Sequence, residues 1–123
     1  MATQNLTAAD FETTILNNPI VLVDFWAAWC APCRAFAPTF EAASAKHEGI
    51  VFGKVDTEAE QALAQAAHIV SIPTLMAFRD GILVFSQPGA LRPADLEHLI
   101  GQVEALNMDD VREQVAAQQG AGA

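Results

Sequence analysis

The sequence predicts an α/β fold in which a central mixed sheet of four to five strands is flanked by helices. The chain has 123 residues, 52% of them hydrophobic, which suits one compact domain. Helical and strand-like segments alternate along its first half, an order typical of α/β sheets with right-handed crossovers. Two later apolar runs flank Asp80-Gly81, and this dipeptide in that position predicts a β-hairpin and hence antiparallel pairing.

The first predicted elements are a short helix and a buried strand. Thr7-Ala-Ala-Asp10 has the form of a capping box, which opens a helix, and Asn17-Asn18-Pro19 ends that helix. The inner face of the helix is expected to carry Phe11, Ile15 and Leu16. From Ile20 to Trp26 the chain is almost continuously apolar, which predicts a strand buried on both faces of the sheet.

A long helix, a second strand and a short helix follow. From Cys33 to about His47 apolar residues recur at three- and four-residue steps, which predicts a helix, and Pro38 within it predicts a kink. Ile50 to Asp56 is predicted as the second strand. Thr57-Glu-Ala-Glu60 is a second capping box, and it opens a helix that ends near Ala67.

The last third of the chain contains the predicted hairpin and a further helix. The hairpin strands are Thr74 to Arg79 and Ile82 to Ser86, and Pro88-Gly89 breaks the second strand. Pro93 fits the first turn of the helix that follows. The apolar stripe of that helix consists of Leu96, Leu99, Ile100, Val103 and Leu106. We therefore place one domain at residues 1–106.

Residues 107–123 are predicted to be a short C-terminal extension, because the chain becomes polar and alanine-rich there. A weak stripe of Met108, Val111 and Val115 predicts one helical turn or more. The last five residues, Gln119 to Ala123, lack such a stripe, and we expect them to be frayed. The sequence assigns this extension no role.

Charge and hydropathy exclude several classes of protein. The 15 acidic and 6 basic residues give a formal net charge of −9, which argues against nucleic acid or an anionic membrane as the main partner. The longest apolar runs are far too short to span a membrane. Met1 to Asp10 has neither a basic n-region nor an apolar h-region, so we expect no signal peptide and a cytoplasmic location.

The two cysteines, Cys30 and Cys33, stand where the first predicted strand passes into the long helix. A helix start leaves unpaired N–H groups and a partial positive charge, and both favour a thiolate over a thiol. A thiolate attacks disulfides, and a second thiol three residues on can resolve the mixed disulfide that forms. Two cysteines in a chain without an export signal indicate a redox pair or a metal pair.

Zinc and a structural disulfide are the alternatives for this cysteine pair. Structural zinc usually has four ligands, the chain has no further cysteine, and His47, His68 and His98 lack the spacing of zinc ligands. A structural bridge between residues this close would remove little entropy from the unfolded chain. We therefore expect a redox pair and no metal.

Asp24 places a carboxylate within a strand that is otherwise predicted to be buried. An unpaired buried carboxylate is costly, and its pKa rises in response. Groups held in this state are often functional, although structural ion pairs produce the same pattern. Asp24 is therefore a candidate for proton transfer, and a structural ion pair remains the alternative.

Five motifs of the chain resemble those of thioredoxins and occur in the same order. They are Asp24-Phe-Trp-Ala-Ala-Trp-Cys-Ala-Pro-Cys33, Lys54-Val-Asp56, Ser71-Ile-Pro-Thr74, Phe78-x-Asp-Gly81 and Gly89-Ala90. The resemblance extends from about Leu6 to Leu106 and implies the thioredoxin fold. It also implies reduction of protein disulfides by dithiol–disulfide exchange, with Cys30 as the nucleophile and Cys33 as the resolving thiol.

The resemblance implies roles for two charged residues beside the cysteine pair. In thioredoxins an aspartate at the position of Asp24 is regarded as the proton acceptor and donor for the second cysteine, here Cys33. Lys54 matches a family position near that carboxylate. Asp24 could also be held by the Lys54 ammonium in a structural pair, and the two roles are compatible.

The resemblance further implies a surface on which protein substrates rest. In thioredoxin-like folds the proline at the position of Pro73 is cis and faces the cysteine pair. The backbone of Ile72 then pairs with an extended substrate segment, as in strand addition. The implied apolar rim consists of Trp29, Ala31, Pro32, Ile72, Pro73, Gly89 and Ala90.

The implied partners are disulfide-containing proteins and a thioredoxin reductase that passes electrons from NADPH, and no bound cofactor is implied. We expect a monomer. The dipeptide Ala31-Pro32 departs from the commoner Gly-Pro, but it contains no histidine, so we expect a reducing couple. Two alternatives stay open: an interaction or chaperone module in which the cysteines are incidental, and an exported disulfide oxidase or isomerase.

Overall fold

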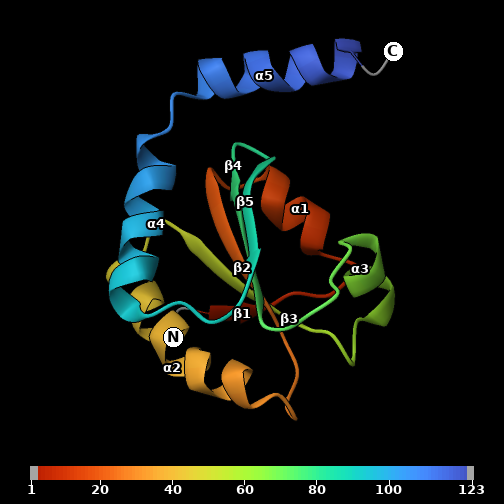
Figure 1. Ribbon diagram of the computed structural model, residues 1–123, viewed down its shortest axis with the longest axis vertical. Coiled ribbons are helices and arrows are strands. Elements are labelled where there is room, and N and C mark those ends of the chain that lie inside the picture. Colours follow the sequence, from red (N-terminus) through yellow and green to blue (C-terminus); the bar gives the residue numbers. More distant parts are fainter. Residues whose placement is uncertain (1–2, 122–123) are drawn as a thin grey trace.

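The computed structural model describes residues 3–121 and shows a central sheet with helices on both sides (Figure 1). The sheet strands are β1 (Thr3–Asn5), β2 (Ile20–Trp26), β3 (Val51–Asp56), β4 (Thr74–Arg79) and β5 (Ile82–Pro88). The helices are α1 (Phe11–Leu16), α2 (Ala31–Lys46), α3 (Gln61–Ala66), α4 (Pro93–Ala105) and α5 (Met108–Ala121).

The strands form one mixed sheet in the order β1-β3-β2-β4-β5. The pairs β1–β3 and β2–β3 are parallel, whereas β2–β4 and β4–β5 are antiparallel. This arrangement confirms the predicted mixed sheet. It places β2, which carries Asp24 and leads to the cysteines, at the centre of the sheet.

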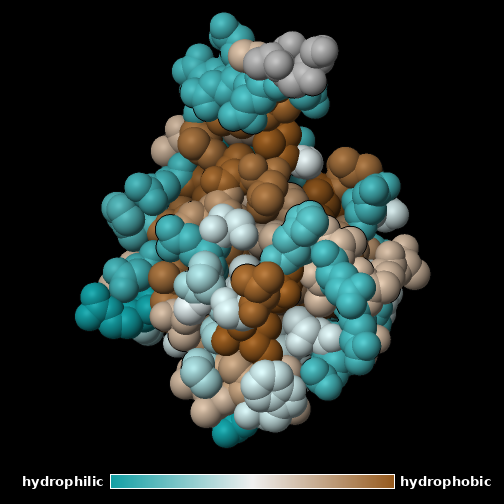
Figure 2. Space-filling view, turned by 45° about the vertical axis from the view of Figure 1, so that its right-hand side comes forward, coloured by the Kyte–Doolittle hydropathy of each residue, from teal (hydrophilic) through white to brown (hydrophobic). Residues whose placement is uncertain are grey.

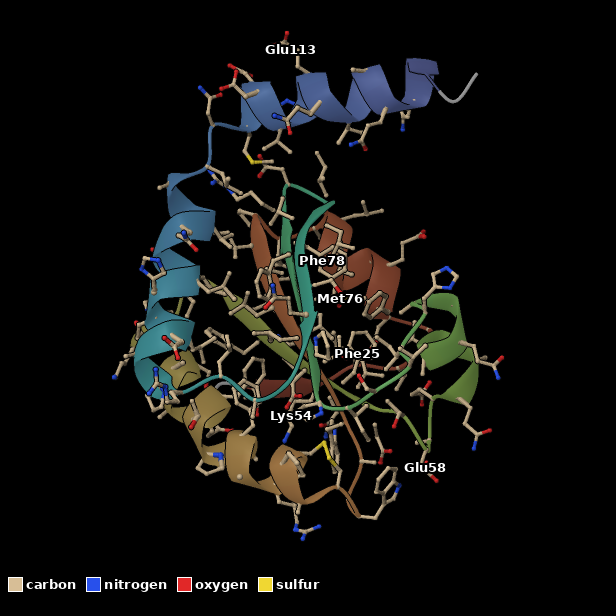
Figure 3. All side chains as sticks on the ribbon, viewed as in Figure 1. Phe25, Lys54, Glu58, Met76, Phe78 and Glu113 are labelled. Atoms are coloured by element: carbon tan, nitrogen blue, oxygen red, sulfur yellow. A yellow bond between two sulfur atoms is a disulfide. The ribbon has the colours of Figure 1, made fainter. Side chains whose placement is uncertain are left out.

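Each face of the sheet is covered by two helices, α2 and α4 on one side and α1 and α3 on the other (Figure 1). Alternate residues of β2 point to opposite faces, so Leu22 packs with α2 and α4 while Val21 and Val23 pack on the other side. Figure 3 labels Phe25, Met76 and Phe78, which belong to the cluster on the α1 and α3 side. Burial on both faces explains why β2 is almost continuously apolar.

The predicted hairpin between β4 and β5 is confirmed. Asp80 and Gly81 connect the two strands, and both have positive φ, 52° and 81°. Two successive residues with positive φ are typical of the type I′ turn, whose twist matches that of the paired strands. Aspartate and glycine are among the residues that adopt this conformation at low cost.

The second predicted capping box, Thr57 to Glu60, is wrong. The carboxylate of Asp56 accepts hydrogen bonds from the backbone N–H groups of Glu58 and Ala59, at 2.9 and 3.3 Å. The Glu60 carboxylate instead accepts from the Ala8 N–H at 2.9 Å. Helix α3 therefore has no side-chain cap from Glu60, because this carboxylate satisfies a distant backbone group.

Three other expectations need correction. The Asp10 carboxylate accepts from the Thr7 N–H at 2.7 Å, as a capping box requires, but helix α1 itself begins only at Phe11. Leu16 is 64% exposed rather than on the inner face. Strand β1 was not predicted, because three residues with one half-buried side chain carry little pattern. Helix α2 begins at Ala31, two residues earlier than expected, because Cys30 caps it and a proline occupies its first turn.

Arg79 of β4 joins the sheet to the C-terminal end of α4. Its guanidinium donates hydrogen bonds to the carbonyl oxygens of Val103 and Glu104, at 2.7 and 3.1 Å, and more weakly to that of Leu106 at 3.4 Å. The last carbonyls of a helix have no partner within the helix, and a cation there also meets the negative end of the helix dipole. Arg79 therefore caps α4 from outside.

The C-terminal extension forms a helix of 14 residues, α5, which extends beyond the expected minimum of one turn. Met108 is buried, and Arg112 pairs with Asp80 of the hairpin at 3.6 Å. Of the five residues expected to be frayed, 119–121 belong to α5 and 122–123 lie outside the described residues. The division into a domain of residues 1–106 and an extension of residues 107–123 remains a prediction.

Apolar side chains remain partly exposed between α5 and β5. They line a hollow of about 290 Å³ and comprise Ile82, Leu83, Val84, Leu106, Val111 and Val115. Figure 2 shows hydrophobic surface below the hydrophilic helix at the top of the molecule. None of the helices formed by residues 3–121 is long and apolar enough to cross a membrane.

Candidate active site

The cysteine pair lies at the start of α2, as the sequence predicts. Cys30 is the N-cap residue, and Cys33 lies in the first turn of the helix, with 5.2 Å between the two Cα atoms. The two sulfurs form a disulfide, and the backbone N–H of Cys33 points at the Cys30 sulfur at 3.2 Å. In the reduced protein this N–H and the helix dipole favour the Cys30 thiolate.

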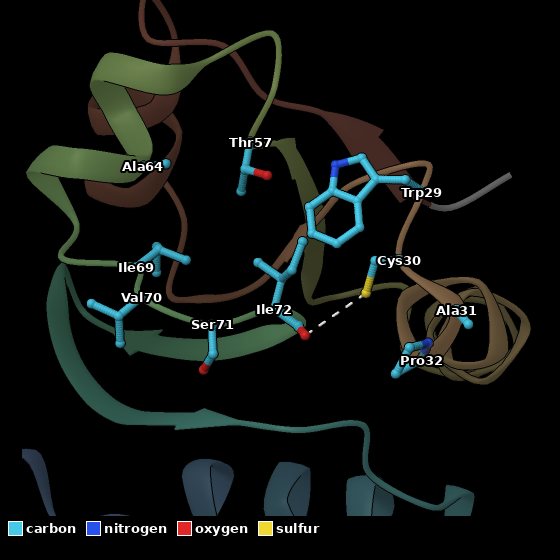
Figure 4. Close-up of a pocket in the computed structure, with 10 residues that line it drawn as sticks. All are labelled: Trp29, Cys30, Ala31, Pro32, Thr57, Ala64, Ile69, Val70, Ser71 and Ile72. Carbon is cyan, nitrogen blue, oxygen red and sulfur yellow. Dashed lines mark hydrogen bonds between the residues drawn. The ribbon is translucent and has the colours of Figure 1, made fainter.

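The two cysteines differ in what they can reach. Both residues are almost fully buried, with 4% of Cys30 and 2% of Cys33 exposed, and they pack against Ala27, Trp26 and Ile72. Cys30 lines a groove of about 430 Å³, whereas Cys33 does not (Figure 4). Cys30 is therefore the sulfur that a molecule in the groove meets first.

The loop before β4 faces the cysteine pair. The Ile72–Pro73 peptide bond is cis, as the resemblance implies, and the Ile72 carbonyl oxygen lies 3.7 Å from the Cys30 sulfur (Figure 4). The Gly89 N–H donates to the Pro73 carbonyl at 2.7 Å, which ties this loop to the end of β5. Ile72 therefore presents backbone atoms beside the reactive sulfur.

Four of the seven residues of the implied substrate rim line the groove. Trp29 is 67% exposed, and it lines the groove together with Ala31, Pro32 and Ile72. Pro73 is buried and does not line the groove. Gly89 and Ala90 are exposed but lie outside the residues that line the groove.

Sequence reasoning missed the other side of the groove. It is formed by Thr57, Ala64, Ile69, Val70 and Ser71. Val70 is the most exposed of the large apolar residues described, at 96%. The available signal was the β-branched pair Ile69-Val70 directly before the Ser71-Ile-Pro-Thr74 motif, outside any predicted strand.

Asp24 is buried on β2 without a hydrogen-bond partner for either carboxylate oxygen. Burial raises the pKa of Asp24 from 3.8 to about 6, and the Lys54 ammonium partly opposes this rise. The two residues are neighbours in the register of β2 and β3, but no ion pair joins them in the described part of the chain. Asp24 therefore loses its proton near pH 6 rather than near pH 3.8.

The Lys54 ammonium lies over the ring of Trp26, 4.9 Å from its centroid. This cation–π contact holds the ammonium near the end of β2. Figure 3 shows Lys54 at the end of the sheet where the disulfide lies. The structure thus places Lys54 at the end of the sheet that carries the cysteine pair, and it places Asp24 opposite Lys54 in the register of β2 and β3.

Two of the three histidines have a local partner or a local backbone role. His47 contacts the Glu97 carboxylate at 2.7 Å, and His68, two residues after the end of α3, adopts a left-handed conformation with φ of 59°. Within residues 3–121, no three His, Cys, Asp or Glu side chains come together as metal ligands would.

A cysteine pair at a helix start, facing a cis-proline loop beside a groove, defines a thiol–disulfide oxidoreductase. The family model described as Thioredoxin matches residues 2–102. A putative thioredoxin 2 from Streptomyces coelicolor is 52% identical over 118 residues, which is 96% of this chain and 88% of the relative. Thioredoxin from Porphyra purpurea is 38% identical over 104 residues, 83% of this chain and 97% of that protein.

Solved structures give the same result. A thioredoxin from Plasmodium falciparum superposes with a TM-score of 0.76 and 34% identity, covering 81% of this chain and 98% of the other. A thioredoxin from Malassezia sympodialis gives a TM-score of 0.75 and 30% identity, covering 85% of this chain and 96% of the other. The chain belongs to the thioredoxin family, and it is a protein disulfide reductase that acts by thiol–disulfide exchange.

Proposed function

We propose that Cys30 is the nucleophile and Cys33 the resolving thiol of this reductase, with Asp24 as the proton acceptor for Cys33. The observation that carries these roles is that Cys30 lines the groove while Cys33 does not. The N-cap position of Cys30 supports its role as the thiolate, because the helix start stabilises negative charge there.

The reaction has two exchange steps. The Cys30 thiolate attacks one sulfur of the substrate disulfide, which forms a mixed disulfide and releases the other substrate sulfur as a thiolate. Cys33 then attacks the Cys30 sulfur, which forms the Cys30–Cys33 disulfide and releases the second substrate sulfur. The substrate gains two electrons and two protons, and the protein loses them.

Asp24 supports the second step by taking the proton from the Cys33 thiol. A base with a pKa near 6 is mostly ionised at neutral pH and still holds a proton well enough to return it in the reverse direction. The Lys54 ammonium favours the ionised form and limits the rise in the pKa of Asp24. Lys54 therefore tunes the base rather than reacting itself.

Membership of the thioredoxin family supports the proposal for the rest of the cycle. A thioredoxin reductase that draws electrons from NADPH returns the pair to the dithiol, and the protein itself binds no cofactor. The substrate segment rests on Trp29, Ala31, Pro32 and Ile72, with Pro73, Gly89 and Ala90 shaping the adjoining edge. We place the monomeric protein in the cytoplasm, where a reducing couple finds a reducing environment.

The test combines a reduction potential with three variants. Wild type should reduce the disulfides of insulin, with a potential near or below the cytosolic glutathione poise. Cys33→Ser should accumulate the mixed disulfide, whereas Cys30→Ser should form none with the same substrate. Asp24→Asn should reduce insulin more slowly through the resolving step.

Two results would replace this proposal. A potential far above the glutathione poise would make the protein an oxidase or isomerase and contradict the cytoplasmic location. A pair that cannot be cycled between thiol and disulfide would leave the interaction or chaperone module. In that case, replacing both cysteines with serine would leave the function intact.

A further inference from the structure

We propose that this reductase prefers disulfides that lie next to a bulky apolar side chain, and that Val70 sets this preference. The proposal rests on the disulfide reductase function above and adds the chemistry of the substrate segment. It concerns the part of the groove that is lined by Ile69, Val70 and Ser71.

The groove is uncharged although the chain carries a net charge of −9. None of its lining residues is an Asp, Glu, Lys, Arg or His. A charged substrate side chain in this groove would lose hydration without meeting an opposite charge, which is costly. An apolar side chain would instead remove its own surface and that of the groove from water, which is favourable.

Two exposed apolar side chains lie along the groove. Trp29 is 67% exposed and Val70 is 96% exposed, the highest values among the large apolar residues described. Figure 4 shows Trp29 beside Cys30 and Val70 further along the loop that contains Ile72. Exposed apolar surface that gathers around a reactive group marks a contact site for a partner.

The position of Cys30 identifies the occupant of the groove. Because Cys30 is one of the lining residues, the chain segment that forms the mixed disulfide must lie along this surface. In an extended segment the side chain two residues from the cysteine lies on the same face, about 7 Å along the strand. This is the substrate side chain that we assign to the space between Trp29 and Val70.

Val70 differs from the other apolar residues on its side of the groove. Ala64 is buried, and Ile69 packs against the core cluster on the α1 and α3 side, so both also stabilise the fold. Val70, at 96% exposure, has almost no packing role within the chain. A change at position 70 therefore alters the chemistry of the groove without altering the core.

The experiment uses the full chain and short synthetic peptides joined by a single disulfide. The peptides differ only in the two residues that lie two positions before and two positions after the cysteine, which are both Phe, both Gln or both Glu. Reduction is measured as kcat/KM for wild type, Val70→Thr, Val70→Lys and Leu16→Lys. Leu16 is the matched control, because it is an exposed apolar residue on α1 and does not line the groove. Hydroxyethyl disulfide, which is too small to span the groove, reports the reactivity of Cys30 alone.

We expect wild type to reduce the Phe peptide about tenfold faster than the Glu peptide in kcat/KM, mainly through KM, a factor within the range of hydrophobic pockets. Val70→Thr should weaken this preference, and Val70→Lys should reverse it towards the Glu peptide. Leu16→Lys should keep it. Wild type and the control Leu16→Lys should reduce hydroxyethyl disulfide at the same rate.

Equal kcat/KM values for the three wild-type peptides would overturn the inference, and so would a preference that survives in Val70→Lys. Both results leave the reductase function standing as long as hydroxyethyl disulfide is reduced. A wild-type protein that reduces neither the peptides nor hydroxyethyl disulfide would instead overturn the proposed function. The small disulfide therefore separates the two failures.

Discussion

Replacing Asp24 with asparagine should remove most of one pH-dependent contribution to the stability of this protein. Asparagine has nearly the same shape as aspartate but does not titrate between pH 4 and 8. Asp24 is 1% exposed, and neither of its carboxylate oxygens accepts a hydrogen bond. The ionised carboxylate of Asp24 therefore destabilises the folded protein, and its pKa is raised to about 6 for the same reason.

The magnitude follows from the two pKa values. Because the folded-state pKa of Asp24 lies above 3.8, its ordinary value, the folded protein binds this proton more tightly than the unfolded chain does. The contribution of Asp24 to stability is fully present below pH 3.8 and is lost as the pH rises through about 6. The step from 3.8 to about 6 corresponds to a loss of about 3 kcal/mol.

The measurement is urea unfolding of the oxidised protein at several pH values from 4 to 8, for wild type and Asp24→Asn. The free energy of unfolding of the variant should rise relative to wild type by about 2.4 kcal/mol between pH 4 and pH 8, because part of the full difference lies below pH 4. The buried amide adds a cost of its own, but that cost is the same at every pH. Parallel curves for the two proteins would refute the reasoning, because they would show that Asp24 does not titrate differently on folding.

Three further predictions follow from the same structure. Lys54→Met removes the cation that opposes the rise in the pKa of Asp24, so the carboxyl titration followed by NMR should move to higher pH; an unchanged titration would contradict this electrostatic role. Arg79→Met should lower the free energy of unfolding by about 1–3 kcal/mol, because it leaves carbonyls at the end of α4 without their donor. Urea unfolding that gives the same free energy for the variant and wild type would contradict the capping role. Gly53→Ala should lower the free energy of unfolding by about 1–3 kcal/mol in the same assay, because the added methyl group would overlap the Leu6 side chain. An unchanged free energy of unfolding would contradict this prediction.

Local sequence patterns were enough to predict most of the fold, the cysteine pair and the buried carboxylate. The Asp80-Gly81 turn depends on the φ preferences of two adjacent residues, so it can be predicted without knowledge of any distant contact. Cys30 and Cys33 are three residues apart, and their place at a helix start follows from the segments on either side. Asp24 was conspicuous because a carboxylate interrupts an apolar strand.

The failures share a dependence on partners that are distant in sequence. The Glu60 carboxylate binds the N–H of Ala8, 52 residues away, so its capping-box position did not determine its partner. Strand β1 forms only because β3 offers an open edge to three residues. Leu16 has the spacing of an inner-face residue, yet the short helix α1 leaves it exposed.

The sequence by itself determined the family, the cysteine pair and the buried carboxylate, because each is encoded in a short segment with a local physical meaning. Only the tertiary structure decided which of the two cysteines lines the groove and which residues surround it. The groove joins Trp29 and Cys30 to Thr57, Ala64 and Val70, which come from separate segments. The exposure of Val70 depends on how those segments pack, and no local pattern in the chain specifies that packing.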